Sequence, residues 1–266
     1  AYLSVTQSHP EWLVKKWINE LGYAETLQLC QANNHASRVT LRVNPRIISD
    51  KACIDRLEQS GIQLKSTALS GYYQVIDNQP KALNELLQAG MLSIQDVSAG
   101  LAVRLIDIVP GDVVLDVCGA PGGKSAALAE HSDDQCVILS SDISPSRSRL
   151  IDSTVKRLNL QHVYPVTAAA QQFPALKADI VLLDAPCSGL GVLQRKADLR
   201  WQRKPWDIKE LSLLQKDLLD AAATHVRPGG QLVYSTCTVL REENEDIVYF
   251  FLKNHTEFTL QPGSDM

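Results

Sequence analysis

The chain has 266 residues, a hydrophobic content of 45%, a charged content of 21% and a formal net charge of −4. This length suits one large domain or two small ones, and the composition is typical of a soluble globular protein. No run of about 18 apolar residues is present, which argues against a membrane-spanning helix. The first residues lack the basic segment and apolar core of a signal peptide. The net charge excludes a generally basic nucleic-acid-binding surface, but it leaves room for a local basic patch.

The cysteines are scattered along the chain, and no two of them form a Cys-x-x-Cys pair. This pattern argues against a zinc site. Free thiols are the default in a reducing compartment. We therefore expect a cytoplasmic monomer that holds no metal and contacts no membrane. The six thiols belong to Cys30, Cys53, Cys118, Cys136, Cys187 and Cys237.

Three segments are expected from the patterning. Residues 1–36 form a helical segment with helices at 11–18 and 24–32, the first of them opened by Pro10. Residues 37–92 form a small α+β module that resembles RNA-binding modules. Residues 93–266 form the larger domain. The small module is expected to contain strands at 38–43, 62–64 and 72–76 and helices at 50–60 and 82–89.

The larger domain alternates between strand and helix patterns after a helix at 99–108. Because the strands are apolar and rich in β-branched residues, they predict an α/β fold with a mostly parallel sheet covered by helices on both faces. Ligands bind such sheets at the carboxyl ends of the strands. The expected strands are 113–117, 136–141, 163–166, 179–183 and 231–235, and the expected helices are 124–130, 146–158, 207–225 and 241–254.

A glycine-rich turn at residues 118–124 follows the first of these strands and precedes a helix. Glycines there allow backbone N–H groups to approach a ligand closely. Asp142 ends the next strand about 20 residues further on, where a carboxylate commonly binds a ribose. A helix N-cap is the alternative for Asp142. The turn matches neither the dinucleotide fingerprint nor the P-loop, so we favour another nucleoside cofactor.

Two cysteines lie at the ends of later strands. Cys187 follows Asp184 within a proline- and glycine-rich loop, and Cys237 follows the last strand. A thiol at the ligand edge of a sheet is a candidate nucleophile. The pair is compatible with covalent catalysis by a thiolate beside a carboxylate, or with a redox disulfide.

The segment 195–206 carries five basic residues, one acidic residue and two tryptophans. Phosphate contacts and base stacking require this composition, and its position beside Cys187 at the ligand edge predicts contact with the substrate. A solvated basic loop is the alternative. The residues expected to make this contact, which the family resemblance described below makes a contact with RNA, are Arg195, Lys196, Arg200, Trp201, Arg203 and Lys204.

The motifs DVCGAPGGK (116–124), DAPCSG (184–189) and STC (235–237) resemble those of the S-adenosylmethionine-dependent RNA cytosine-C5 methyltransferases. The resemblance is closest to the bacterial 16S rRNA methyltransferases of the RsmB (Fmu/Sun) type. SHPEWLVKKW (8–17), LRVN (41–44) and IQDVSAGLA (94–102) are similar to the regions that precede the catalytic domain in that group. The resemblance covers most of the chain and implies a Rossmann-like class I methyltransferase fold.

The resemblance also implies roles for individual residues. Cys237 would add to C6 of a cytosine in RNA, and Cys187 would assist product release. DNA cytosine methyltransferases use the Pro-Cys cysteine instead, so sequence position alone leaves the two roles open. Asp184 would bind the cytosine edge, Lys124 would lie near the reacting centre, and the target base would be unstacked. The implied cofactor-binding residues are Cys118, Gly119, Ala120, Pro121, Gly122, Gly123, Lys124, Asp142 and Asp184.

Three departures from the family pattern stand out. Residues 167–170 contain no carboxylate where the family has an aspartate near the adenine, so we expect weaker cofactor binding or substitution by Gln171 or Gln172. The family's N-terminal helical domain and its last hairpin are also missing, so we expect either a fragment or a sheet that closes differently. These departures favour the alternative function of a catalytically impaired RNA-binding or assembly module. A thiol oxidoreductase is the third alternative.

Overall fold

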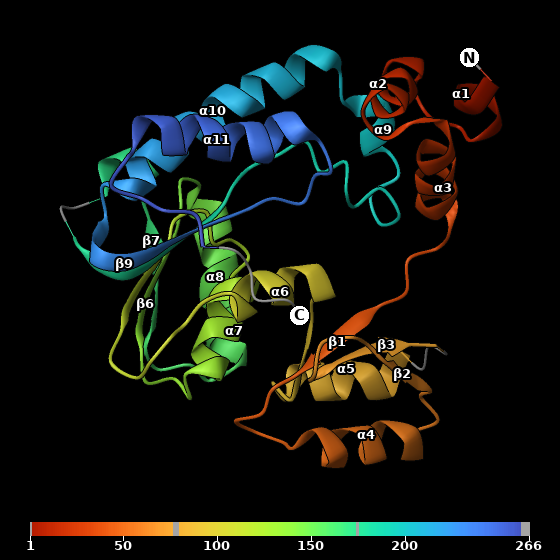
Figure 1. The fold of residues 1–266 in the computed structure, drawn as a ribbon. Helices are drawn as coiled ribbons and strands as arrows, with labels where there is room; N and C mark the ends of the chain where they lie inside the picture. The colour runs from red at the N-terminus through yellow and green to blue at the C-terminus, as the bar shows by residue number, and fades with distance from the viewer. Residues whose placement is uncertain (1, 77–79, 174–175, 262–266) are drawn as a thin grey trace. The chain divides into compact units, whose positions relative to one another are not determined.

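The computed structural model describes all residues except 1, 77–79, 174–175 and 262–266 (Figure 1). The described chain divides into two compact units. The helical unit comprises residues 1–37, 185–217 and 236–260, and the sheet unit comprises residues 38–184, 218–235 and 261. This division follows spatial contacts, and the three-segment organisation expected from the sequence stays a prediction.

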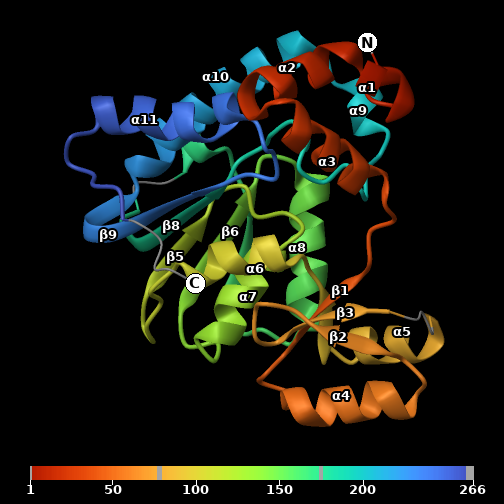
Figure 2. The same ribbon diagram turned by 45° about the vertical axis from the view of Figure 1, so that its right-hand side comes forward.

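A five-stranded parallel sheet forms the larger part of the sheet unit, with the strand order β7-β6-β5-β8-β9. Val114, Ile138 and Ile180 are buried at its centre. Figures 1 and 2 show α6, α7 and α8 together on one face of this sheet. The bounds are β5 Val113–Asp116, β6 Val137–Asp142, β7 Val163–Thr167, β8 Ala178–Asp184, β9 Val226–Ser235, α6 Val97–Arg104, α7 Gly123–His131, α8 Pro145–Arg157 and the 3-10 helix η1 Ala170–Gln172.

A four-stranded antiparallel sheet with the order β2-β3-β1-β4 precedes the parallel sheet. The α/β class with a small α+β module is therefore confirmed. Leu41, Leu57 and Leu92 are fully buried in the core of this module. Its elements are β1 Thr40–Val43, α4 Asp50–Gln59, β2 Leu64–Ser66, β3 Tyr72–Val75, α5 Pro80–Gln88 and β4 Leu92–Ile94.

One strand of the small module is displaced from its predicted position, and one observed strand was not predicted. The strand expected at 62–64 begins at Leu64, because Ile62 closes α4 instead. The Ile62 N–H donates to Leu57 O at 3.0 Å and the Gly61 N–H donates to Glu58 O at 2.9 Å. Gly61 has a φ of 78°, as this helix-ending motif requires. The three-residue strand β4 was not expected.

Arg42 of β1 joins the small module to the parallel-sheet part of the same unit. Its Nη2 lies 2.9 Å from Oε1 of Glu130, and both side chains are buried. Its Nη1 donates to Gly123 O at 3.0 Å and to Gln95 Oε1 at 2.5 Å. Gly123 belongs to the glycine-rich turn at residues 118–124. The hydrogen bond from Arg42 to Gly123 O therefore also fixes the position of that turn.

The helical unit is built from helices packed around buried Leu13, Trp17, Leu193 and Leu240. The helix expected at 241–254 is interrupted at Asn244, whose φ of −123° and ψ of −96° are not helical. In this unit lie α1 Tyr2–Thr6, α2 Glu11–Leu21, α3 Tyr23–Asn34, α9 Leu199–Gln202, the 3-10 helix η2 Arg241–Glu243 and α11 Glu245–Asn254. The helix α10 (Pro205–Ala223) begins in the helical unit and ends in the sheet unit.

Candidate functional site

The glycine-rich turn connects β5 to α7 in the sheet unit. The Gly119 N–H donates to Ser141 O at 2.8 Å, which holds the turn against β6. A Cβ on Gly119 would collide with the Ser140 hydroxyl and lie 2.8 Å from Asp116 Oδ2. Gly122 has a φ of 96°, which residues other than glycine rarely adopt. The backbone can therefore follow this path only with glycine at both positions.

Asp116 lies beneath the turn and is completely buried. Its Oδ2 accepts a hydrogen bond from Ser125 Oγ at 2.5 Å, and its Oδ1 has no hydrogen-bond partner among the described residues. Burial raises the pKa of Asp116 to about 7. Burial and nearby carboxylates likewise raise the pKa of Cys118 to about 12, so its thiol stays protonated and unsuited to nucleophilic attack.

The structure brings Lys124 and Asp184 together at the carboxyl edge of the parallel sheet. Lys124 Nζ lies 2.6 Å from Asp184 Oδ2. Asp184 Oδ1 accepts from Ser235 Oγ at 2.7 Å, because Asp184 and Ser235 are register partners at the ends of β8 and β9. Ser235 was not among the expected site residues, although its place at a strand end was a usable signal.

Asp142 ends β6, as expected for a ribose-binding carboxylate. Its Oδ2 accepts from Arg147 Nε at 2.7 Å, and its Oδ1 accepts from the Ser144 N–H at 3.0 Å. Ser144, rather than Asp142, is the residue before α8. After β7, Ala168 donates its N–H to Asp142 O at 3.2 Å, and no carboxylate follows within 168–172.

The thiols of Cys187 and Cys237 lie together in the helical unit, 3.2 Å apart. This separation exceeds the roughly 2.05 Å of a disulfide bond, so no disulfide joins the two cysteines. The Cys237 N–H also donates to Cys187 Sγ at 3.3 Å. The hydrogen bond with Cys237, together with burial, raises the pKa of Cys187, which keeps its proton. Cys237 is the exposed member of the pair.

Glu243, a residue that the sequence analysis did not single out, anchors the loop that carries Cys187. Its fully buried carboxylate accepts from the Ser188 N–H at 2.8 Å and from Ser188 Oγ at 2.5 Å. Gln215 Nε2 donates to Glu243 Oε1 at 3.1 Å and to Pro186 O at 2.9 Å. Both neighbours of Cys187 in the chain are thereby held in place. No local sequence pattern indicates that Glu243 anchors this loop.

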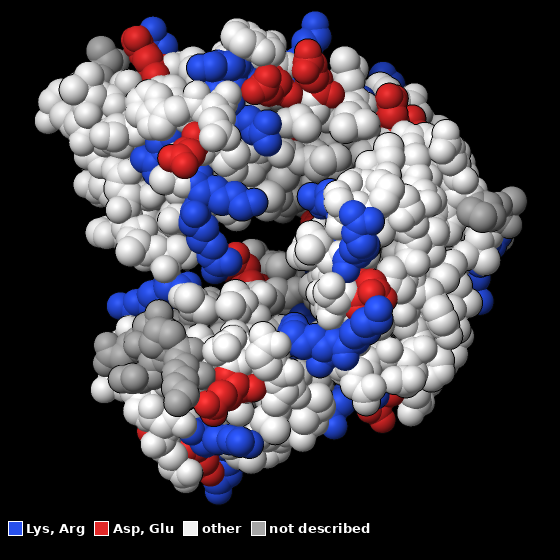
Figure 3. Space-filling model, turned by 180° about the vertical axis from the view of Figure 1, so that it is seen from behind, with Lys and Arg blue, Asp and Glu red and all other residues white. Residues whose placement is uncertain are grey.

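The basic segment 195–204 divides into exposed and internal residues. Lys196, Lys204 and Trp201 are exposed. Arg195 is also exposed and donates to Ser37 Oγ at 3.0 Å. Arg203 is half-buried and donates to Ser188 O at 2.9 Å. Figure 3 shows basic and acidic side chains interspersed on the face in view, in keeping with the small net charge.

Arg200 does not have the surface position expected for a phosphate contact. It is buried, and its guanidinium donates to Ser8 O, Asn34 Oδ1 and Asn33 O at 3.2, 2.7 and 3.1 Å. These bonds join the end of α3 to α9 and involve both terminal nitrogens. The binding of RNA by Arg200 therefore stays a prediction.

In the described parts of the chain, no group of His, Cys, Asp and Glu side chains could hold a metal ion. No helix among the residues placed by the structure is long and apolar enough to cross a membrane.

Comparison with known proteins identifies the family. The family described as 16S rRNA methyltransferase RsmB/F matches residues 103–265. A second family, described as an RsmF/B-like, ferredoxin-like domain, matches residues 9–77. The probable ribosomal RNA small subunit methyltransferase B of Bacillus subtilis is 35% identical over 260 residues, which cover 96% of this chain and 58% of the relative. The enzyme of that name from Erwinia tasmaniensis is 35% identical, with 97% and 61% covered.

Solved structures show the same fold. The crystal structure of PH0851 superposes with a TM-score of 0.94 at 31% identity, covering 99% of this chain and 61% of that one. NSun6 from Pyrococcus horikoshii superposes with a TM-score of 0.86 at 22% identity, covering 96% and 89%. The chain spans about three fifths of the length of the two curated relatives. Because the RsmB/F description matches more than half of its residues, this chain belongs to the 16S rRNA methyltransferase RsmB/F family.

Proposed function

We propose that this chain transfers a methyl group from S-adenosylmethionine to C5 of a cytosine in small-subunit ribosomal RNA, through a covalent adduct with Cys237. The observation that carries the proposal is the pair of thiols 3.2 Å apart that no disulfide joins, one on an exposed residue and one held protonated. A pair of this kind provides a nucleophile and a second group able to move a proton beside it.

The turn at residues 118–124 fits a methyl-donating nucleoside cofactor. Gly119 and Gly122 keep its backbone free of side chains, and the buried Oδ1 of Asp116 has no partner among the described residues. Residues Cys118 to Lys124 would hold the cofactor with Asp142 at the ribose and Asp184 nearby, and the cofactor supplies the methyl group when bound. The Lys124–Asp184 ion pair presents a carboxylate whose orientation Ser235 fixes.

Chain connectivity limits how far the thiols can lie from this carboxylate. Cys187 is three residues after Asp184 and Cys237 is two residues after Ser235. With about 3.8 Å between successive Cα atoms, the Cα atoms of each pair are within about 11 and 8 Å of one another. Asp184 and Ser235 are themselves register partners. Covalent connection alone thus keeps both cysteines near the ends of β8 and β9.

In the proposed reaction, Cys237 gives up its proton and its thiolate sulfur forms a bond to C6 of the cytosine. Asp184 hydrogen-bonds the base edge and favours protonation of N3, so that the C5–C6 electron pair shifts to C5. C5 would take the methyl group as the bond between that methyl and the cofactor sulfur breaks, which would leave S-adenosylhomocysteine. Loss of the C5 proton to a base, with loss of the N3 proton, then restores the C5–C6 double bond, breaks the S–C6 bond and returns the thiolate. Cys187, next to Cys237, assists this release. The exposed Lys196, Lys204 and Trp201, with Arg195 and Arg203, contact the RNA.

The test is methyl transfer to ribosomal RNA with labelled S-adenosylmethionine. Cys237→Ala is expected to abolish transfer, whereas Cys187→Ala is expected to leave an RNA–protein adduct that survives denaturing electrophoresis. Full activity of Cys237→Ala contradicts the assignment of the nucleophile. Bisulfite sequencing of the product identifies the methylated atom and the cytosine.

The absence of a carboxylate at residues 168–172 favours a second candidate, an RNA-binding module that has lost catalysis. Calorimetry separates the two functions. No heat of binding at millimolar S-adenosylmethionine, together with retained RNA binding, supports the second function and excludes the first.

A further inference from the structure

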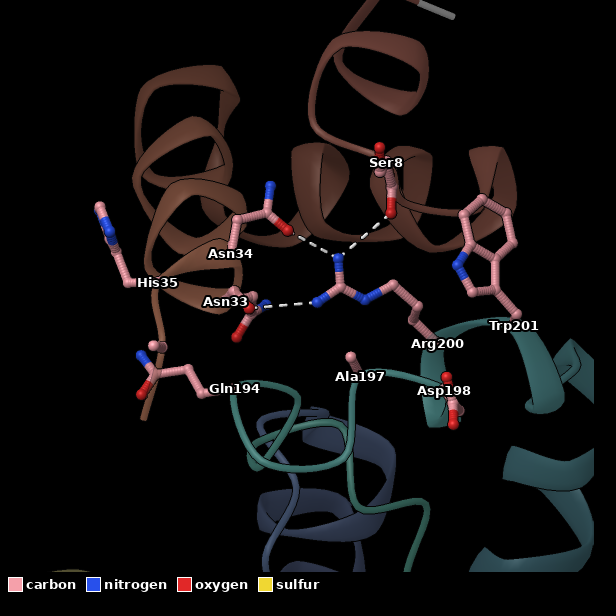
Figure 4. Close-up of a pocket in the computed structure, with 10 residues that line it drawn as sticks. Ser8, Asn33, Asn34, His35, Gln194, Ala197, Asp198, Arg200 and Trp201 are labelled. Atoms are coloured by element: carbon pink, nitrogen blue, oxygen red, sulfur yellow. Dashed lines mark hydrogen bonds between the residues drawn. The ribbon is translucent and has the colours of Figure 1, made fainter. Parts of the chain in front are cut away.

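A cavity of about 350 Å³ lies within the helical unit, between the end of α3 and the segment that runs into α9. Its size is in the range of small-ligand pockets. Figure 4 shows the Arg200 guanidinium in the middle of the lining residues, with Asn33 and Asn34 on one side and Trp201 on the other. No step of the proposed methyl transfer uses this cavity.

Two buried N–H donors of the lining have no hydrogen-bond partner among the described residues. They are Nδ2 of Asn33 and Nε of Arg200. The two residues are 6% and 5% exposed, respectively. Buried donors without acceptors are rare in folded proteins because each one costs free energy. Both groups require an acceptor, so a ligand of this cavity carries carbonyl oxygens or ring nitrogens.

The charges of the lining favour a neutral ligand over an anion. Arg200 carries a positive charge and Asp198 a negative one, and the remaining lining residues include the amide of Gln194. Trp201 is 55% exposed at the cavity and offers an indole face. Amides that pair with base edges and an aromatic face for stacking are the features with which proteins hold an unstacked base. Exposed Lys196, which lies between the lining residues Gln194 and Ala197, can meet a backbone phosphate.

We propose that this cavity binds one unstacked base of single-stranded RNA, outside the nucleotide that is methylated. The inference rests on the proposed function for the identity of the substrate. It assigns Trp201 as the stacking platform and Asn33 as a donor to the base edge. Arg200 reaches the base through Nε, while its terminal nitrogens hold the cavity wall.

The test measures the dissociation constant of short single-stranded RNAs that contain the target site, by fluorescence anisotropy and without cofactor. One abasic nucleotide is moved along the RNA. With the unmodified protein, an abasic residue at one position is expected to weaken binding about tenfold. Trp201→Ala is expected to weaken binding of the intact RNA about tenfold and to abolish the further loss at that position. Trp201→Phe, which keeps an aromatic face, is expected to restore most of the affinity.

Tyr249→Ala is the matched control, because Tyr249 is an exposed aromatic residue on α11 of the same unit and does not line the cavity. It is expected to leave the dissociation constant within twofold. An abasic penalty that is equal in the Trp201→Ala and unmodified proteins overturns the proposal. If binding behaves as expected while no methyl is transferred, the cavity assignment stands and the proposed function fails. If Trp201→Ala transfers methyl groups with an unchanged KM for RNA, the proposed function stands and the cavity assignment fails.

Discussion

The carboxylate of Glu243 accepts two hydrogen bonds from Ser188, one from its N–H at 2.8 Å and one from its hydroxyl at 2.5 Å. Since Ser188 follows Cys187 directly, this contact fixes the backbone that carries the thiol. Gln215 extends the same arrangement to Pro186 on the other side. The position of Cys187 therefore depends on a carboxylate 56 residues away in the chain (243 minus 187).

Glu243→Ala is expected to lower the free energy of unfolding by about 2 to 4 kcal/mol, because it leaves the Ser188 N–H and one of the two N–H groups of the Gln215 amide buried without an acceptor. It is also expected to slow diamide-driven disulfide formation between Cys187 and Cys237. Urea unfolding and thiol titration measure the two effects. Glu242→Ala removes a half-exposed neighbour paired with Lys16 and should cost less than about 1 kcal/mol. Equal losses in both variants contradict the anchoring role.

Gly119→Ala is expected to destabilise the chain by about 2 kcal/mol or more and to prevent S-adenosylmethionine binding, because a Cβ there meets buried Ser140 and Asp116. Gly123→Ala is the matched variant in the same turn. Its Cβ would lie 3.5 Å from Gln95 Nε2, an ordinary contact, and it lies in the first turn of α7. Its free energy of unfolding should stay within about 1 kcal/mol of the unmodified protein. Thermal unfolding and calorimetry distinguish the two.

The Arg42–Glu130 pair predicts strong non-additivity. Either Arg42→Met or Glu130→Met alone leaves one buried charge without its partner, which costs about 3 to 5 kcal/mol. The double variant removes both charges and should lose less than the sum of the single losses by about 2 kcal/mol. A double-mutant cycle of urea unfolding measures this difference. Additive losses would show that the two charges do not interact.

Asp184→Asn is expected to lower kcat for methyl transfer by about 100-fold or more, because the amide cannot favour the protonated base as a carboxylate does. Ser235→Ala removes only the hydrogen bond that orients Asp184, so it should lower kcat by roughly tenfold. Single-turnover rates with ribosomal RNA test both expectations. A larger effect of Ser235→Ala than of Asp184→Asn contradicts the assigned order of roles.

His9 makes stability depend on pH. Burial and the charge of Arg200 lower its pKa from 6.5 to about 4 in the folded chain. The unfolded chain therefore binds the proton more readily, so the contribution is complete above pH 6.5 and declines as the pH falls towards 4. Between pH 7.5 and pH 5 the loss is roughly 2 kcal/mol. His9→Phe should remove this dependence, which urea unfolding of both proteins at the two pH values can measure. If the free energy of unfolding falls equally with pH in both proteins, His9 is not the cause of the pH dependence.

Local patterns in the sequence were enough to place most of the elements and the edge at which ligands bind. The apolar strands, the glycine-rich turn and the residues that end β8 and β9 follow from periodicity and turn chemistry, which act over a few neighbouring residues. These features are local, so they can be recognised without knowing what packs against them. The expected roles of Asp184 and Lys124 at one site came instead from the resemblance of their motifs to a known family.

The tertiary structure alone decided which side chains share a hydrogen bond or lose their solvent. Arg200 has the same sequence surroundings as the exposed Lys196 and Lys204, yet the packing of α3 against α9 buries it. The paired thiols of Cys187 and Cys237 and the anchoring carboxylate of Glu243 join segments about 50 residues apart. Burial and partnership depend on the whole set of packed neighbours, and no short stretch of sequence contains that information.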